Sequence, residues 1–319
     1  MRNACTTFML AALAAAASSC GDRADDDAAV AGNTAVTDSS AITVADVGFA
    51  TPESVLYDDA ADLYLVSNIN GEPLGRDDNG FISQVDPNGA VVQLKWIDGA
   101  ADGITLHAPK GMGLRGDTLF IADIDSVRLF HRGTGEVLGA RGVPNASFLN
   151  DIAVGDDGVY VTDTGVDASF APTGSAAIYH FGADGPTAVA TGDALQGPNG
   201  IATNRSDVLV VPFGGNTVMI VRPGAAPETV ATLPTGQLDG IVYLDDGSLL
   251  VSSWEGSAVY LVGTDGVITT IVENIDSPAD IGWDSRRRRV LIPSFTGNRI
   301  EIRGVDEPAG ADGEQGAAR

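Results

Sequence analysis

Thiol and imidazole side chains are scarce in this chain of 319 residues, which has two cysteines and three histidines. Both cysteines lie within the first 20 residues, so they offer no disulfide framework for a folded domain. His107, His131 and His180 lack the spacing of a metal-binding motif. No Gly-x-Ser-x-Gly turn is present either, so a serine nucleophile is not indicated. Any metal site in this protein is therefore expected to use oxygen ligands.

Basic residues are also few, since 18 Lys and Arg face 43 Asp and Glu and give a formal net charge of -25. Such a surface repels nucleic acids and anionic lipids, so we expect no nucleic-acid partner. The carboxylates are compatible with binding of divalent cations, although a solvated surface that keeps the protein soluble is the simpler explanation. The run of four arginines at residues 286–289 is expected to form a solvated hairpin turn.

Aromatic residues make up only 6% of the chain, whereas glycine is abundant at 40 residues. From residue 41 onward the apolar runs are short, alternate with polar residues and end at Gly, Asp, Pro or Asn. No convincing amphipathic helical pattern occurs. We therefore predict an all-β fold with many tight turns.

The first 19 residues have the pattern of an export signal. Arg2 is followed by an apolar segment at residues 8–17 that is too short to span a bilayer alone. The sequence SSCG at residues 18–21 resembles a bacterial lipobox, which predicts lipidation of Cys20 and an outer-membrane lipoprotein facing the periplasm. Ordinary cleavage before Cys20, giving a soluble periplasmic protein, is the alternative. Cys5 is removed in both cases, so the mature chain can form no internal disulfide.

Two segments flank the expected folded domain. Residues 20–40 and 304–319 consist largely of small and acidic residues without periodicity. We expect the first to be an acidic flexible linker and the second a disordered tail. The folded domain is then expected to span residues 41–303.

This domain repeats one unit of four short strands six times. Each unit opens with a polar residue and an apolar strand, as in GPNGIA at residues 197–202 and LDGIVY at 238–243. Such a repeat predicts a six-bladed β-propeller. The last unit lacks a fourth strand, and the run AITVADVGF at residues 41–49 is expected to supply it and close the ring.

In a propeller the first strand of each blade lines the central channel, so corresponding residues should meet in one ring. That ring is predicted to contain Glu53, Lys110, Asn150, Asn199, Asp239 and Asp280. Carboxylate and amide oxygens suit a hard divalent cation. We predict that one ion is held there, with calcium favoured and zinc, magnesium or manganese as alternatives; its ligands would be Glu53, Asn150, Asn199 and Asp239. Alternatively, these groups only cap strand ends and hydrate the channel.

The motifs resemble those of the senescence-marker-protein, gluconolactonase and luciferin-regenerating-enzyme family. The resemblance spans residues 41–303 and rests on PESV with Glu53, FLNDIAV with Asn150, GPNGIA with Asn199 and LDGIVY with Asp239. It implies a metal-dependent hydrolase, typically a lactonase, in which the metal polarises the lactone carbonyl. In that reading Asp239 is both metal ligand and general base, and Asp151 orients a ligand.

Two residues depart from the sugar-lactonase pattern of this family. Phe148 stands two residues before Asn150, where an Arg is usual, and this disfavours a polyhydroxylated sugar acid as substrate. Lys110 is unusual in a cation-binding ring, so it is expected to pair with Asp280 or Glu53 or to bind the carboxylate of a product. Four aromatic residues are expected either to line the mouth, favouring an apolar substrate, or to pack between blades; they are Phe148, Phe213, Trp254 and Phe295.

The sequence thus predicts a monomeric, exported hydrolase of a small lactone or related ester, which meets the membrane only through a lipid anchor. A non-catalytic propeller that binds a ligand or partner protein at the cell envelope is an open alternative, as is a lyase with a similar metal and propeller. Long loops at residues 69–80 and 166–174 are expected to shape the site.

Overall fold

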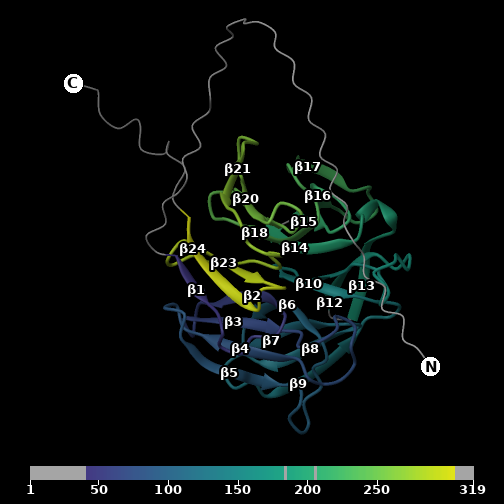
Figure 1. Cartoon of the computed structure of the whole chain (residues 1–319). Coiled ribbons are helices and arrows are strands. Elements are labelled where there is room, and N and C mark those ends of the chain that lie inside the picture. The colour runs from purple at the N-terminus through teal and green to yellow at the C-terminus, as the bar shows by residue number, and fades with distance from the viewer. Residues whose placement is uncertain (1–40, 183–184, 205–206, 306–319) are drawn as a thin grey trace, which may run out of the picture. The chain divides into compact units, whose positions relative to one another are not determined.

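The computed structural model describes residues 41–182, 185–204 and 207–305, which form one β-propeller (Figure 1). The predicted signal peptide, the lipidation site Cys20, the linker at 20–40 and the tail from residue 306 lie outside the described residues. Among the residues that are described, no helix has the length and apolar character needed to cross a membrane.

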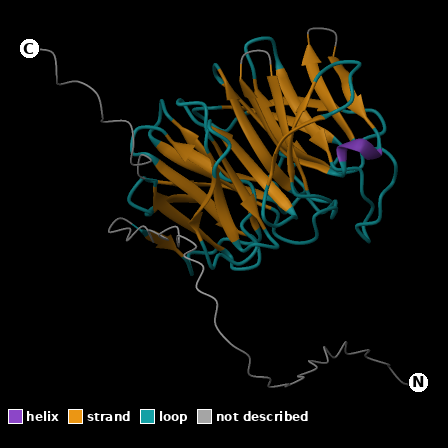
Figure 2. Cartoon of the chain, turned by 90° about the horizontal axis from the view of Figure 1, so that it is seen from above, coloured by secondary structure: helices purple, strands orange, loops and turns teal. Residues whose placement is uncertain are grey.

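The propeller has six blades, each a sheet of four antiparallel strands, and its one described helix is the short 3-10 helix η1 (Asp193–Leu195) (Figure 2). Blade 1 contains β2 (Pro52–Asp58), β3 (Leu63–Asn68), β4 (Phe81–Val85) and β5 (Val91–Asp98). Blade 2 contains β6 (Pro109–Arg115), β7 (Thr118–Asp123), β8 (Ser126–His131) and β9 (Val137–Gly142). Blade 3 contains β10 (Leu149–Val154), β11 (Val159–Asp163), β12 (Ala177–Gly182) and β13 (Gly185–Thr191).

The second half of the chain repeats this order. Blade 4 contains β14 (Pro198–Asn204), β15 (Asp207–Pro212), β16 (Thr217–Val221) and β17 (Glu228–Thr232). Blade 5 contains β18 (Leu238–Tyr243), β19 (Leu249–Ser253), β20 (Ala258–Val262) and β21 (Ile268–Val272). Blade 6 contains β22 (Gly282–Asp284), β23 (Arg289–Ser294), β24 (Arg299–Gly304) and β1 (Ile42–Val44). The predicted all-β, six-bladed propeller is confirmed.

The two ends of the propeller close the ring within blade 6. Strand β1 pairs antiparallel with β24, with Ile42 opposite Ile302 (purple beside yellow in Figure 1). The hydroxyl of Thr43 also donates a hydrogen bond to Glu301 at 2.6 Å. The predicted closure by the N-terminal strand is therefore confirmed, and β24 ends at Gly304, one residue beyond the expected boundary.

The first strands of successive blades contact one another around the centre, from β2 through β6, β10, β14, β18 and β22 back to β2. Figure 1 shows this inner ring, with β5, β9, β17 and β21 at the periphery. The hydrophobic core is divided into layers between neighbouring blades, for example Leu65 and Ile82 of blade 1 against Met112 and Ile121 of blade 2. Because successive side chains of a strand point to opposite faces, each blade contributes to two such layers.

In each of blades 1 to 5, the pairing between the first and the second strand is interrupted near the start of the first strand. In blade 1, Pro52 pairs with Asn68 and the next pair is Val55 with Val66, so residues 53 and 54 form a bulge. Bulges redirect side chains away from the regular alternation of a strand. The same interruption recurs between residues 109 and 112, 149 and 152, 198 and 201, and 238 and 241. Five of the six residues predicted to form the channel ring are the first residue of such a bulge.

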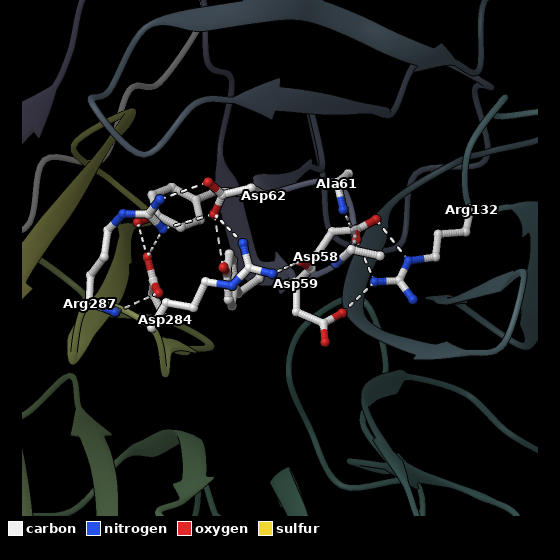
Figure 3. Close-up of polar contacts among 11 residues, drawn as sticks. Asp58, Asp59, Ala61, Asp62, Arg132, Asp284 and Arg287 are labelled. Carbon is white, nitrogen blue, oxygen red and sulfur yellow. Dashed lines mark hydrogen bonds and ion pairs between the residues drawn. The ribbon is translucent and has the colours of Figure 1, made fainter.

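Ion pairs join blade 1 to its two neighbours (Figure 3). Arg287 of blade 6 contacts Asp62 at 2.7 Å and Asp284 at 2.9 Å. Asp284 is fully buried and also accepts a hydrogen bond from Tyr64 at 2.7 Å. On the other side, Arg132 of blade 2 pairs with Asp58 and Asp59 of blade 1, as Figure 3 also shows. These contacts fix the interfaces beside the closure.

We expect Arg287→Met to lower the free energy of unfolding by about 2 kcal/mol, because buried Asp284 loses a charged hydrogen-bond partner. Urea unfolding at constant m value measures this change. Arg286→Met is the matched control: Arg286 is more exposed, contacts Asp62 at 3.5 Å and donates to the exposed backbone oxygen of Asp59 at 2.7 Å, so its loss leaves no buried charge unpaired and should cost less than about 1 kcal/mol. Equal effects of the two substitutions would contradict the assigned role of Arg287.

Candidate functional site

A cavity of about 630 Å³ lies at one end of the channel. Glu53, Lys110, Asn150 and Asp239 line it, and each comes from the bulge of a different first strand. Asn199, the first bulge residue of blade 4, lies beside Asp239. The fold thus brings five predicted site residues, which are far apart in the chain, to one place.

Asp280 does not belong to this set. In blade 6, Pro278 bridges to Ser294 as Pro52 pairs with Asn68 in blade 1, so the next residue, Ala279, takes the place of Glu53. The prediction that Asp280 stands at the equivalent ring position is therefore wrong. Its polarity suggested that position, but register is decided by pairing with the second strand, and a shift of one residue turns a side chain to the other side.

Asp280 instead meets Asp151 and Ser54 in a separate cavity of about 310 Å³. Ser54 donates its hydroxyl to Asp280 at 2.5 Å, and burial raises the pKa of Asp280 to about 7. Asp151 accepts the backbone N–H groups of Ile152 at 2.6 Å and Ile201 at 2.8 Å. Asp151 therefore ties together the first strands of blades 3 and 4, which carry the predicted metal ligands Asn150 and Asn199.

Four buried oxygens of the predicted ligands accept no hydrogen bond: Glu53 Oε2, Asn150 Oδ1, Asn199 Oδ1 and Asp239 Oδ1. Each unpartnered buried oxygen costs about 1–3 kcal/mol, so four beside one cavity call for a ligand that satisfies them. The other end of the Asn150 amide is fixed, because Nδ2 donates to Thr164 Oγ1 at 3.0 Å and leaves the oxygen free.

The donor set fits a hard divalent cation. It combines two carboxylates with two amide oxygens, which are the ligand types that calcium takes. Within the described ranges no group of three or more His, Cys, Asp and Glu side chains is placed to hold a metal, so a site here depends on the two amides. The residues present therefore suit calcium better than a thiol- or imidazole-seeking metal.

The electrostatic surroundings of Glu53 and Asp239 also favour a bound cation. Burial raises the pKa of Glu53 and of Asp239 well above the usual range, and neighbouring carboxylates raise both further. The Asn199 amide and the Trp254 indole face Asp239 and oppose this rise. Neither forms a hydrogen bond of standard geometry with it, and Trp254 Nε1 is buried without an acceptor. Both carboxylates need a compensating positive charge to stay ionised.

Lys110 occupies the ring position of blade 2 and is 1% exposed. Its Nζ donates to the backbone oxygens of Pro73 and Ala108, both at 3.0 Å. It forms no ion pair within 4.0 Å in the part of the chain that the structure describes. The predicted pairing with Glu53 or Asp280 is therefore wrong, because the loop at residues 69–80 supplies a carbonyl acceptor instead.

Aromatic side chains form much of the cavity wall. They are Phe148, Phe170, Phe213, Trp254 and Phe295. The ring of Trp254 lies 5.4 Å from that of Phe213 and 5.1 Å from that of Phe295. Phe148 lies 6.0 Å from Phe170 and 4.5 Å from Lys110 Nζ. The four aromatic residues that the sequence analysis named thus form an apolar part of the cavity wall, next to the polar side chains of the inner strands.

Sequence reasoning did not identify Phe170 or Thr164. Phe170 lies in the long loop at residues 166–174, is 59% exposed and covers Phe148 at the edge of the cavity. Thr164 follows β11 directly and holds both the Asn150 amide and the carbonyl oxygen of Pro198. The sequence TDTG at residues 162–165 was the available signal, since three polar residues there end a buried strand.

No protein family matches this chain by sequence, and no curated protein does. Solved structures do share its fold. Virginiamycin B lyase from Staphylococcus aureus has a TM-score of 0.60 at 12% identity over 83% of this chain and 98% of the lyase. A catalytically inactive form of that lyase, with one histidine replaced by alanine and with quinupristin, has a TM-score of 0.55 at 14% identity over 80% and 95%.

Gluconolactonase structures are also similar. A gluconolactonase from Xanthomonas campestris has a TM-score of 0.60 at 19% identity over 80% of this chain and 86% of that chain. A protein assigned to the gluconolactonases has a TM-score of 0.63 at 19% identity over 82% and 91%. At these identities the similarity shows the propeller fold, and the activity must be argued from the residues of the cavity.

Proposed function

We propose that this protein is a divalent-cation-dependent hydrolase of a lactone or related ester, exported to the cell envelope. The observation that carries the proposal is a set of four buried oxygens without hydrogen-bond donors, each from a different blade; three belong to residues that line one aromatic-walled cavity, and the fourth, Asn199 Oδ1, belongs to the neighbour of Asp239. A cation bound there would polarise the substrate carbonyl and stabilise the oxyanion. Calcium suits the donor set best.

The roles of the protein groups follow from their positions. Glu53, Asn150, Asn199 and Asp239 would hold the cation, and Thr164 orients the Asn150 amide. Asp239 takes a proton from the attacking water while the water oxygen bonds to the acyl carbon. The acyl–oxygen bond then breaks, and Asp239 returns the proton to the leaving oxygen. The aromatic wall excludes bulk water from this exchange.

A histidine-dependent lyase is less well supported. The S. aureus lyase of similar fold is inactive when one histidine is replaced by alanine. All three histidines of this chain lie within the described residues, and none of them lines the cavity. A non-catalytic binding protein would use the same cavity without turnover, so measured turnover separates it from the hydrolase.

Metal binding provides the direct test. Chelated protein titrated with calcium should take up one ion per chain and gain about 2.7 kcal/mol of stability at a free concentration of 100 times Kd. Glu53→Gln should lose most of this gain, whereas Glu273→Gln, at an exposed position, should keep it. The same samples are then offered aryl esters and aromatic lactones.

The possible outcomes test calcium binding and hydrolysis separately. Uptake of calcium with hydrolysis that depends on it supports the enzyme. Absence of both binding and hydrolysis rejects it, and binding without turnover of any ester or lactone favours the non-catalytic binding protein.

A further inference from the structure

The chain contains only two lysines, and they differ sharply in their surroundings. Lys95 lies on the outer strand of blade 1, where it pairs with Asp98 at 3.3 Å and stands 4.9 Å from the ring of Phe81. Lys110 also stands over an aromatic ring, that of Phe148 at 4.5 Å, but it is buried and has no carboxylate partner within 4.0 Å among the described residues. Only Lys110 lines the cavity.

A buried ammonium without a counter-ion is costly, usually by several kcal/mol. Lys110 is partly compensated, because two of its three N–H donors reach carbonyl oxygens and its charge faces an aromatic ring. One donor is left for a ligand. Burial lowers the pKa of Lys110 to about 8, and the nearby carboxylates of Glu53 and Asp123 oppose this fall.

The charge balance of the cavity also favours an anion. Glu53 and Asp239 together would neutralise one divalent cation, which leaves the charge of Lys110 uncompensated on the cavity wall. Of the described residues, Glu72 is the one other carboxylate that lines the cavity, and it is exposed to solvent. Counting the cation and only the buried charged residues that line the cavity, a ligand with one negative charge would make the site neutral; Asp151 and Asp280 lie in the separate cavity, and Asp123 is paired with Arg128.

We propose that Lys110 binds a carboxylate on the ligand, and that the substrate is an apolar, most simply aromatic, carboxylic acid that also carries the ester or lactone. The aromatic wall receives the body of this molecule, and Lys110, which shares the inner ring with the predicted metal ligands, receives its anionic group. The identity of the bond that is broken rests on the proposed function, whereas binding of the anion does not.

Paired ligands test this directly. We would measure the binding of 3-phenylpropanoate and its neutral analogue 3-phenylpropanamide to calcium-loaded protein by isothermal titration calorimetry. The carboxylate should bind at least about tenfold more tightly than the amide, which corresponds to about 1.4 kcal/mol. Lys110→Met should abolish this preference and leave the affinity for the amide within about twofold. Lys95→Met should behave as the wild type.

Two results would overturn the proposal. One is equal binding of carboxylate and amide by the wild-type protein, which needs no variant to observe. The other is a preference that persists in Lys110→Met and disappears on chelation, because the cation and not Lys110 would then hold the anion. Lys110→Gln serves as a second neutral variant should Lys110→Met fail to fold.

This test is separable from that of the hydrolase. An intact carboxylate preference without hydrolysis of any ester rejects the proposed reaction and leaves Lys110 as an anion-binding residue. Hydrolysis without the preference rejects the role of Lys110 and leaves the reaction standing.

Discussion

Asp239→Asn should lower ester or lactone hydrolysis by about 1,000-fold, the largest catalytic effect that we expect from one substitution. The amide keeps the size and one oxygen of the side chain but loses the negative charge and the ability to accept a proton from water. Because Asp239 is buried beside Asn199 and Trp254, no solvent-exposed base can take its place. Calcium affinity should fall as well, since the proposed site would lose one of its two charged ligands.

The two effects can be separated by measuring kcat at saturating calcium, where the remaining loss reports the missing base. Asp245→Asn is the matched control, because Asp245 is an exposed carboxylate of the same blade. It should leave calcium binding and kcat unchanged. Activity of Asp239→Asn within tenfold of the wild type would exclude Asp239 as the general base.

Gly240→Ala should destabilise the propeller by at least about 3 kcal/mol, the largest expected effect on stability. A Cβ atom at residue 240 would lie 2.3 Å from the backbone nitrogen of Ile281 and 2.8 Å from Cα of Asp280. Both are backbone atoms of the next blade, so the clash can be relieved only by moving the two inner strands apart. Thermal and urea unfolding would measure the loss.

Gly142→Ala provides the comparison within an outer strand. No atom lies within 4 Å of the Cβ that it would add, so its stability should stay within about 0.5 kcal/mol of the wild type. If Gly240→Ala were as stable as Gly142→Ala, the close approach of β18 to the residues that lead into β22 would be incorrect. Gly240→Ala is also expected to weaken calcium binding, because Asp239 is the preceding residue of the same bulge.

The same close approach explains the repeated Asn-Gly and Asp-Gly pairs. In GPNGIA, a Cβ at Gly200 would lie 2.2 Å from the backbone oxygen of Asp239 in the next blade. The polar residue of each pair is the first residue of the bulge. The glycine that follows it has no Cβ, so the backbone of the neighbouring blade can approach closely. Turn propensity alone, the usual reading of such pairs, does not describe their role here.

The fold was predictable because its signals are local. Alternating apolar strands, tight-turn residues and the six-fold repeat occur within short segments of the chain, and they predicted six blades and closure by residues 41–49. The set Glu53, Asn150, Asn199 and Asp239 was likewise placed by the repeat, since equivalent strands of a propeller point to the same axis. Its function as a metal site stays a prediction for the calcium titration.

Three features were decided only by tertiary structure. The bridge between Pro278 and Ser294 puts Ala279, not Asp280, at the ring position, because strand pairing and not residue polarity sets register. One of the two acceptors of Lys110, the backbone oxygen of Pro73, comes from a loop 37 residues earlier in the chain, and Phe170 reaches the cavity from another blade. Local sequence determined the six blades and the first bulge residue of the inner strand in blades 1 to 5. Contacts between distant segments determined the register of blade 6 and the groups that each of these residues meets, because neighbouring blades and loop carbonyls leave no signal in the local pattern.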